Sequence, residues 1–159
     1  MIIFFDTSAL IKLFHTEPGS ALVTDLITSP NNDIWISELA RIEFYSALYR
    51  RYRNKEIDGA RLEAAVLGFE EQCLLFNIEP LGQVVVQEAE TLMKRFGKTM
   101  GLRTLDSLQL GSFVLIGGQD WYFTAADETL CRIAEETGAK TINPLSDKLP
   151  NTPPNSNLS

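Results

Sequence analysis

The sequence predicts an α/β fold in which a parallel sheet of about five strands is covered by helices on both faces. Short apolar runs rich in β-branched and aromatic residues alternate along the chain with longer segments of helical periodicity. These runs lack polar alternation, which is typical of strands buried on both sides. The chain has 159 residues, 45% of them hydrophobic, which is enough for one domain with a single folding core. Strands that alternate with helices favour a parallel sheet.

The first part of the chain begins with the strand IIFF at 2–5, which ends at an acidic residue. A helix is expected over 7–14, and Pro18-Gly19 breaks the chain before a second helix over 20–28. The turn sequence SPNND precedes the second strand, IWI, at 34–36. These elements give one strand–helix–strand unit.

Helices dominate the middle of the chain. Ser37 is a good N-cap for a long helix that runs to about Lys55, and Asp58 can cap the next helix. Residues 75–78 are expected to form the third strand, although a helix end is an alternative there. A helix over 83–97 follows, with Gly97 near its C-cap.

The last part of the chain completes the sheet. A helix over 104–117 ends at Gly117-Gly118 and precedes the fourth strand, WYFT, at 121–124. A helix over 127–137 leads to the fifth strand, KTI, at 140–142. We therefore expect one domain over 1–145, and a disordered tail over the proline- and asparagine-rich residues 146–159.

Composition excludes several kinds of chemistry. His15 is the only histidine, so a typical catalytic zinc site would have too few ligands. Cys73 and Cys131 stand far apart within apolar helical patterns and are expected to be buried free thiols. The opening MIIFFD is too short for a signal peptide, and no apolar run is long enough for a membrane span, so we expect a cytoplasmic protein. The net charge of −7 opposes simple attraction to nucleic acid.

Four acidic residues are placed to meet beyond the carboxyl ends of the strands, where open α/β sheets bind ligands. Asp6 follows the first strand and Asp127 the fourth, Glu43 lies two turns into the helix after the second strand, and Asp106 is in the first turn of another helix. Two carboxylates about 5 Å apart repel by roughly 3 kcal/mol at an effective dielectric constant near 20, and a divalent cation would relieve this repulsion. Oxygen ligands without histidine suit Mg²⁺ or Mn²⁺, which favour phosphate oxygens as further partners. A phosphodiester is then the natural substrate.

Each acid also has a structural explanation. Asp6 and Asp127 can simply cap the helices that follow them, and Asp106 can stabilise the dipole of its own helix. Glu43 can pair with Arg50 or Arg41 on the solvent side of its helix. The arrangement of the four residues, rather than any one of them, carries the functional interpretation.

Several segments of the chain together resemble one family, the PIN-domain ribonucleases, and specifically the VapC toxins of bacterial toxin–antitoxin pairs. The similarity spans residues 1 to about 145 and rests on FFDTSALIKLF, ISELARIEFYSAL, GLRTLDSLQL, FTAADETL and GAKTINP, in that order. The resemblance implies a PIN-like three-layer fold with strand order 3-2-1-4-5 and a metal-dependent endoribonuclease activity. It also implies that Asp6, Glu43, Asp106 and Asp127 are the catalytic acids, with Asp6 and Asp106 as the primary Mg²⁺ ligands.

Some positions near these acids refine the comparison. Thr7 and Ser8 stand where family members supply a hydroxyl beside the first acid, although an N-cap role explains them as well. This chain has Gln109 where many relatives carry histidine, which points to a packing or supporting role for that side chain. Two residues separate Thr124 from Asp127, a wider spacing than is common, so Asp127 is the least secure of the four.

The predicted partners are an RNA substrate, a cognate antitoxin and a second copy of the chain. Five basic residues and three tyrosines on the helix from Ser37 to Lys55 could follow an RNA backbone, or could form a solvated helix face with inward-packed aromatic rings. By resemblance, the antitoxin would place an Arg or Lys in the acid cluster, and the protein would form a homodimer. Leu10, Leu13 and Phe14 are candidate dimer contacts, although core packing explains them equally well.

Two other functions stay open. One is a PIN-fold interaction module without catalytic activity, which the presence of all four acids disfavours. The other is a phospho-accepting α/β protein, such as a receiver domain or a haloacid-dehalogenase-type phosphatase, but the string DTSAL at 6–10 lacks the second aspartate that the phosphatase motif needs.

Overall fold

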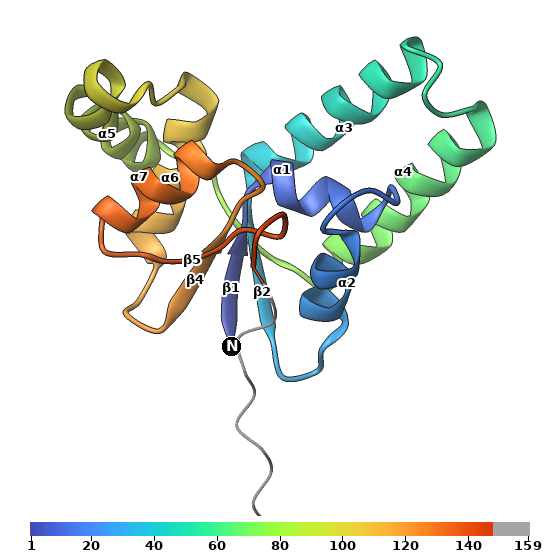
Figure 1. Ribbon diagram of the computed structural model, residues 1–159, viewed down its shortest axis with the longest axis horizontal. Helices are drawn as coiled ribbons and strands as arrows, with labels where there is room; N and C mark the ends of the chain where they lie inside the picture. The colour runs from blue at the N-terminus through green and yellow to red at the C-terminus, as the bar shows by residue number, and fades with distance from the viewer. Residues whose placement is uncertain (148–159) are drawn as a thin grey trace, which may run out of the picture.

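The computed structural model describes residues 1–147 and has a five-stranded sheet in which all neighbouring strands are parallel. The strand order is β3-β2-β1-β4-β5, as the resemblance implied. The strands are β1 (Ile2–Phe5), β2 (Asp33–Ser37), β3 (Asn77–Glu79), β4 (Trp121–Thr124) and β5 (Lys140–Ile142). In Figure 1 the carboxyl end of β1 leads directly into α1, and the N-terminus lies at the opposite edge of the sheet.

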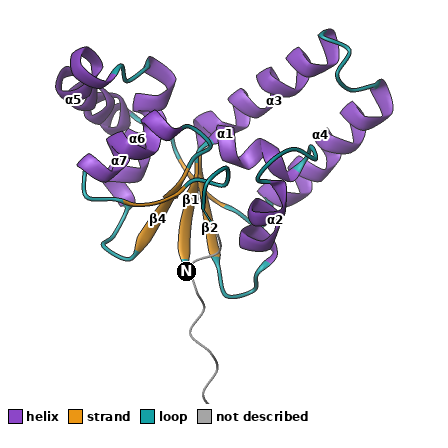
Figure 2. Ribbon diagram, in the orientation of Figure 1, coloured by secondary structure: helices purple, strands orange, loops and turns teal. Residues whose placement is uncertain are grey.

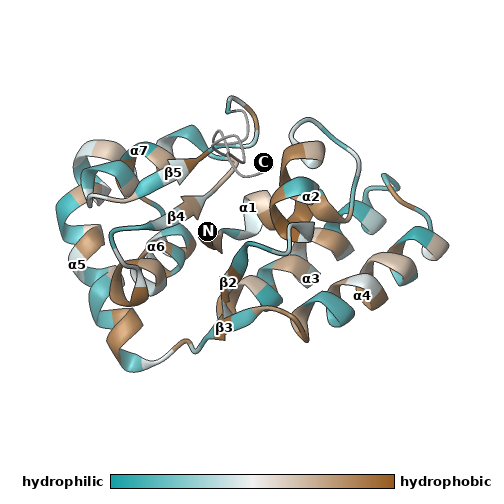
Figure 3. Cartoon of the chain, turned by 90° about the horizontal axis from the view of Figure 1, so that it is seen from below, coloured by the Kyte–Doolittle hydropathy of each residue, from teal (hydrophilic) through white to brown (hydrophobic). Residues whose placement is uncertain are grey.

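Two groups of helices cover the sheet, so the predicted α/β architecture with helices on both faces is confirmed (Figure 2). One group holds α1 (Thr7–Leu10), the 3₁₀ helix η1 (Ile11–Leu13), α2 (Ser20–Thr28), α3 (Glu38–Arg53) and α4 (Gly59–Cys73). The other holds α5 (Gln83–Met100), α6 (Thr104–Ile116) and α7 (Glu128–Glu136). Seen from below, the strands lie between the two groups (Figure 3).

Strand β1 shows why the sheet has a hydrophobic core on each face. Successive side chains of a strand point to opposite faces. Ile3 and Phe5 accordingly pack into the core beneath α2, α3 and α4, whereas Phe4 packs with Phe123 in the core beneath α5, α6 and α7. All three β1 residues are fully buried, so an acid at the next position is held on a rigid support.

Several expected elements differ in detail from those observed. The helix expected over 7–14 is a single α-helical turn followed by the 3₁₀ turn η1. Helix α5 continues past Gly97 and ends at Gly101, whose φ of 73° is a left-handed conformation that glycine adopts without strain. Strand β3 occupies 77–79 rather than 75–78, because Leu74 and Leu75 are exposed at the end of α4.

The two tryptophans lie beside each other across the sheet. Trp35 on β2 and Trp121 on β4 have ring centroids 5.1 Å apart, and both rings are partly buried against the core beneath α5, α6 and α7.

The two cysteines are free, but only Cys131 is buried as expected, whereas Cys73 at the end of α4 is half-buried. Burial raises the pKa of the Cys131 thiol to about 12.

The remaining expectations for the fold concern the tail and membranes. The tail predicted over 146–159 lies almost wholly outside the described residues. Within residues 1–147, no helix is long and apolar enough to cross a membrane.

Candidate active site

Asp6 lies where the central strand ends, at the carboxyl edge of the sheet. Its backbone amide donates to the carbonyl of Thr124 on β4, and its carboxylate accepts from the amide of Ser8, so Asp6 is the N-cap of α1. The capping alternative is therefore correct for this residue. It does not exclude a site role, because the carboxylate also lines a cavity.

Three of the four predicted acids line that cavity, which we call the catalytic cavity. It has a volume of about 350 Å³, and Asp6, Glu43 and Asp106 reach it from β1, α3 and α6. Asp127 lies instead in an adjoining cavity of about 290 Å³, to which Asp106 and Arg103 also contribute. The sequence reasoning therefore placed three acids together correctly, and the fourth is connected to them through Arg103.

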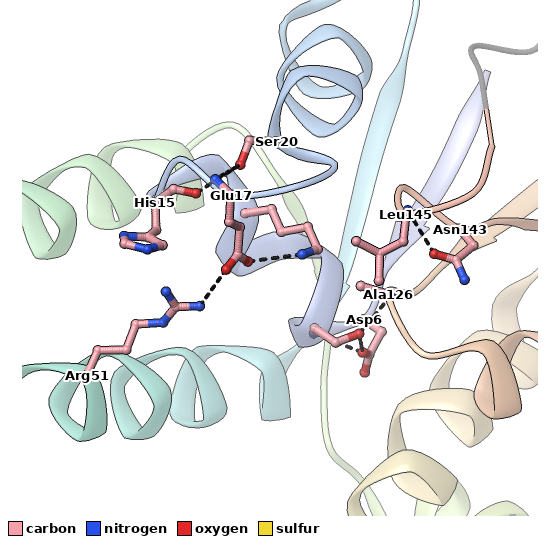
Figure 4. Close-up of polar contacts among 10 residues, drawn as sticks. Asp6, His15, Glu17, Ser20, Arg51, Ala126, Asn143 and Leu145 are labelled. Carbon is pink, nitrogen blue, oxygen red and sulfur yellow. Dashed lines mark hydrogen bonds and ion pairs between the residues drawn. The ribbon is translucent and has the colours of Figure 1, made fainter. Parts of the chain in front are cut away.

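The carboxyl group of Asp6 has a raised pKa. The residue is only 5% exposed, and burial raises its pKa from the ordinary value of 3.8 to about 6. Hydrogen bonds from Ser8 oppose this rise, whereas the charges of Glu43 and Asp106 add to it. The hydroxyl of Ser8 also accepts from the amide of Ala126, which ties α1 to the loop after β4 (Figure 4).

Glu43 is held by a buried polar chain. Its Oε2 accepts from the hydroxyl of Thr7 at 2.8 Å and from Nε2 of Gln109 at 2.6 Å. Gln109 is fully buried, and its own Oε1 accepts from the hydroxyl of Ser37 at 2.6 Å. Glu43 is thus aimed at the cavity by its neighbours, and among the described residues it forms no ion pair with the arginines considered from sequence, Arg41 and Arg50. The supporting role expected for Gln109 agrees with these contacts.

Arg103 is a site residue that the sequence reasoning missed. Its Nε donates to Oδ2 of Asp106 at 2.6 Å, and one terminal nitrogen donates to Oδ2 of Asp127 at 3.2 Å. The hydrogen bond to Asp106 is the largest cause of the raised Arg103 pKa. The other oxygen of Asp127 accepts from the amide of Leu130 and caps α7. The only sequence signal for Arg103 is its position three residues before Asp106, at the start of a helix.

Arginines balance the acids in the catalytic cavity. Arg50 and Arg51, near the end of α3, line it together with Arg103. Three carboxylates and three guanidinium groups therefore face one small volume, an arrangement that can hold a phosphate beside a cluster of oxygen ligands.

The donor set is chemically suited to a hard divalent cation. Carboxylates without imidazole are the ligands that Mg²⁺ and Mn²⁺ prefer, and the raised pKa of Asp6 shows that its ionised form lacks full compensation. As the described side chains lie, no three of the His, Cys, Asp and Glu residues in 1–147 converge closely enough to hold one ion. In this arrangement Arg103 pairs with Asp106 and Asp127.

Comparisons with known proteins agree with this fold. The model of the PIN domain family matches residues 3–136, and the chain belongs to this family. The family assignment and the strand order exclude the receiver-domain alternative, because receivers have the order 2-1-3-4-5. No curated protein matches the sequence.

Several solved structures are similar in fold to this chain. FitAcB from Neisseria gonorrhoeae matches with a TM-score of 0.66 and 15% identity over 91% of this chain and 99% of the other. VapC20 from Mycobacterium tuberculosis, a sarcin-ricin loop cleaving toxin, matches with a TM-score of 0.64 and 18% identity over 82% and 93%. VapBC2 from Rickettsia felis, bound to a promoter DNA fragment, matches with a TM-score of 0.62 and 14% identity over 90% and 98%. At these identities the likeness concerns the fold.

Proposed function

We propose that this chain is a metal-dependent endoribonuclease and the toxin of a toxin–antitoxin pair. One observation carries the proposal: acids from β1, α3 and α6 line a single cavity around Asp6, a buried carboxyl group with a raised pKa. Burying such a group without full compensation is costly, and costs of this kind are concentrated at functional sites. Membership of the PIN family and the toxin structures with the same fold support the proposal.

The residues of the cavity have separate roles in this proposal. Asp6 and Asp106 would hold Mg²⁺ or Mn²⁺, with Glu43 and Asp127 completing the ligand shell directly or through water. When bound, the cation would offset the carboxylate charge and favour a negatively charged phosphate. Arg50 and Arg51 orient that phosphate, and Gln109 and Thr7 hold Glu43 in one position. Ser8 holds Asp6 and fixes which of its oxygens faces the cavity.

The proposed partners are RNA, a cognate antitoxin and a second copy of the chain in the cytoplasm. An antitoxin that inserts an Arg or Lys would find carboxylates that already accept a guanidinium group, as the contacts of Arg103 demonstrate. The dimer contacts considered from sequence need revision. Leu10 is fully buried in the core and is not available for contact with another chain, whereas Leu13 and Phe14 are only partly buried against the same core and stay candidates.

The test is cleavage of single-stranded and structured RNAs with Mg²⁺ by the parent protein and the Asp6→Asn variant. The variant is expected to lose at least about 100-fold in rate, since one transition-state contact typically contributes a few kcal/mol. Asp120→Asn is the matched control, because Asp120 is exposed and pairs only with Lys140 among the described residues; it should retain full activity.

Two outcomes contradict the proposal in different ways. Equal turnover by the parent and the Asp6→Asn variant would remove Asp6 from the catalytic group. No turnover by either protein on any of the RNAs would favour a PIN-fold interaction module instead of an enzyme.

A further inference from the structure

A second, larger cavity opens beside the catalytic cavity. It has a volume of about 630 Å³ and lies between η1 with its following loop, α2, α3 and α4. The two cavities share Ile11 and Arg51 as lining residues, so they adjoin along the last turns of α3. We call the second one the basic cavity, for the residues described next.

Three cations line the basic cavity: Lys12, Arg51 and Arg61. Lys12 is only 7% exposed, which is unusual for lysine. Its ammonium group donates to Glu17 at 3.0 Å, and Arg51 donates to the other oxygen of the same carboxylate at 3.0 Å (Figure 4). Burial raises the pKa of Glu17, but the hydrogen bonds from Lys12 and Arg51 outweigh it and hold that pKa below the ordinary value. One carboxylate thus compensates two cations, and positive charge is left over.

The remaining lining of the basic cavity is mixed, with apolar side chains beside the polar residues His15, Thr16, Ser20 and Thr24. Phe14, Leu48 and Ile57 contribute from the loop after η1, from α3 and from the turn before α4. The cavity therefore combines an apolar surface with a cationic wall. This combination suits a group that carries both a flat ring and a negative charge, as a nucleotide does.

The positive charge continues beyond the basic cavity. A third cavity, of about 660 Å³, shares Ile57 and Arg61 with it and is lined further along by Tyr52, Arg53 and Lys55. Tyr52 is 47% exposed, so its ring is free to stack on an unpaired base. Glu56 and Asp58 reduce the charge here, but the path remains basic in a protein whose net charge is −7.

We propose that the basic cavity binds a nucleotide of single-stranded RNA whose neighbouring phosphodiester lies in the catalytic cavity, and that the strand continues over Arg61 toward Tyr52. The proposal rests on the proposed nuclease function and adds a direction for the strand. It assigns Arg61 on α4 to substrate binding, outside the catalytic cavity. We favour RNA over an acidic peptide as the bound polymer. The three cavities are continuous and lead to the acids around Asp6, where the proposed function places a phosphodiester.

The experiment measures RNA binding apart from cleavage. A fluorescein-labelled single-stranded dodecaribonucleotide is titrated with protein in EDTA, and its anisotropy is followed at several salt concentrations. Arg61→Gln is compared with Arg41→Gln, which removes the same charge from an exposed position on α3 and lines none of the three cavities. Circular dichroism and thermal unfolding verify that both variants fold.

Arg61→Gln is expected to weaken binding about three- to tenfold at low salt and to reduce the salt slope by about 0.7 to 1, as the loss of one phosphate contact should. Arg41→Gln should bind like the parent. In Mg²⁺, Arg61→Gln should reduce kcat/KM more for the dodecamer than for a dinucleotide, because only the longer strand continues past Arg61 toward Tyr52.

The outcomes separate this proposal from the nuclease assignment. RNA binding that depends on Arg61, without any cleavage, would support the binding path and contradict the proposed nuclease function. Cleavage by the parent, together with equal RNA affinity of the Arg61→Gln and Arg41→Gln variants, would support the nuclease function and overturn the binding path. A parent protein that binds no RNA in EDTA, or binds an oligoglutamate of equal charge more tightly than the RNA, would also overturn it.

Discussion

At the scale of single residues, the raised pKa of Asp6 makes the free energy of unfolding fall as pH rises, whereas a carboxyl group with a lowered pKa has the opposite effect. Its pKa is about 6 in the folded protein and near 3.8 when exposed, so the folded state binds the proton more tightly. Between these values the unfolded chain holds fewer protons, and the free energy of unfolding falls as pH rises. The contribution of Asp6 is fully present below about pH 4 and is lost above about pH 6.

The Asp6→Asn variant should therefore be more stable than the parent at pH 7.5 in EDTA. One pKa unit corresponds to about 1.4 kcal/mol, so the gain is at most about 3 kcal/mol and disappears toward pH 4. An asparagine oxygen can still accept from Ser8, which preserves the cap. Thermal or urea unfolding of both proteins from pH 4 to 8 measures the difference. A constant difference over this range would show that the charge of Asp6 carries no such cost.

Arg103 is the residue most directly opposed to cation binding. It pairs with Asp106 and Asp127, and its charge would compete with that of a divalent cation for these carboxylates. Arg103→Gln should bind Mn²⁺ more tightly, by about three- to tenfold at low ionic strength, because the competing charge is absent. Its own stability should change little, since the Arg103 side chain is 70% exposed and exposed ion pairs contribute about 0 to 1 kcal/mol.

Calorimetric titration with Mn²⁺ provides the measurement, and Arg132→Gln on the exposed face of α7 is the charge-matched control. Weaker Mn²⁺ binding by Arg103→Gln than by the control would mean that the guanidinium group organises the carboxylates rather than competing for them.

At the scale of elements, Gln109 joins four parts of the fold. From α6 it donates to Thr7 in α1 and to Glu43 in α3, and it accepts from Ser37 at the end of β2. Because the glutamine is fully buried, loss of its amide would leave Glu43 and Ser37 without this partner in a dry region. The position of Glu43 therefore depends on a helix from the other side of the sheet.

Gln109→Leu should lower the free energy of unfolding by about 2 to 3 kcal/mol, since each buried polar group left unpaired costs about 1 to 3 kcal/mol. Gln87→Leu, on the exposed face of α5, should cost less than about 0.5 kcal/mol. Urea unfolding in EDTA compares the two. A Gln109→Leu protein as stable as Gln87→Leu would show that the polar chain contributes nothing to folding.

The element boundaries that sequence could not supply depend on tertiary contacts. The apolar pattern over 7–14 suits a helix, but Asp6 caps only one α-helical turn before η1 tightens the chain. Gly97 looked like a helix end, yet its helix packs on α6 and continues to Gly101. Strand β3 has no buried side chain, so hydrophobic pattern alone could not locate it.

At the scale of the whole molecule, the alternation of buried strands with helices predicted a parallel sheet covered on both faces, and the family resemblance implied its strand order. The shared location of Asp6, Glu43 and Asp106 followed from the rule that parallel strands present ligands at their carboxyl ends. The place of Arg103 in the site could not be predicted from the sequence, because its second partner, Asp127, is 24 residues away. The basic cavity could not be predicted from the sequence either, because its cations come from three separate elements.

The distribution of charge also becomes clear only at this scale. Arg50, Arg51 and Arg53 near the end of α3 looked like one basic strip in the sequence, but they divide among the three adjoining cavities. Tyr45 packs its ring against Phe44 and Phe69, whereas Tyr49 and Tyr52 are exposed. The inward-packed interpretation of this helix is thus correct for Tyr45, and the RNA-facing interpretation stays a prediction for the exposed Tyr49 and Tyr52.

The contact between Trp35 and Trp121 gives the molecule a natural optical probe of its sheet. These are the only two tryptophans in the chain, and neither lines the catalytic cavity or the basic path. Their ultraviolet emission should therefore follow separation of β2 and β4 during denaturation and stay silent when oligonucleotides or cations arrive. Intrinsic fluorescence can thus report folding in the same cuvette in which a dye-labelled strand reports occupancy.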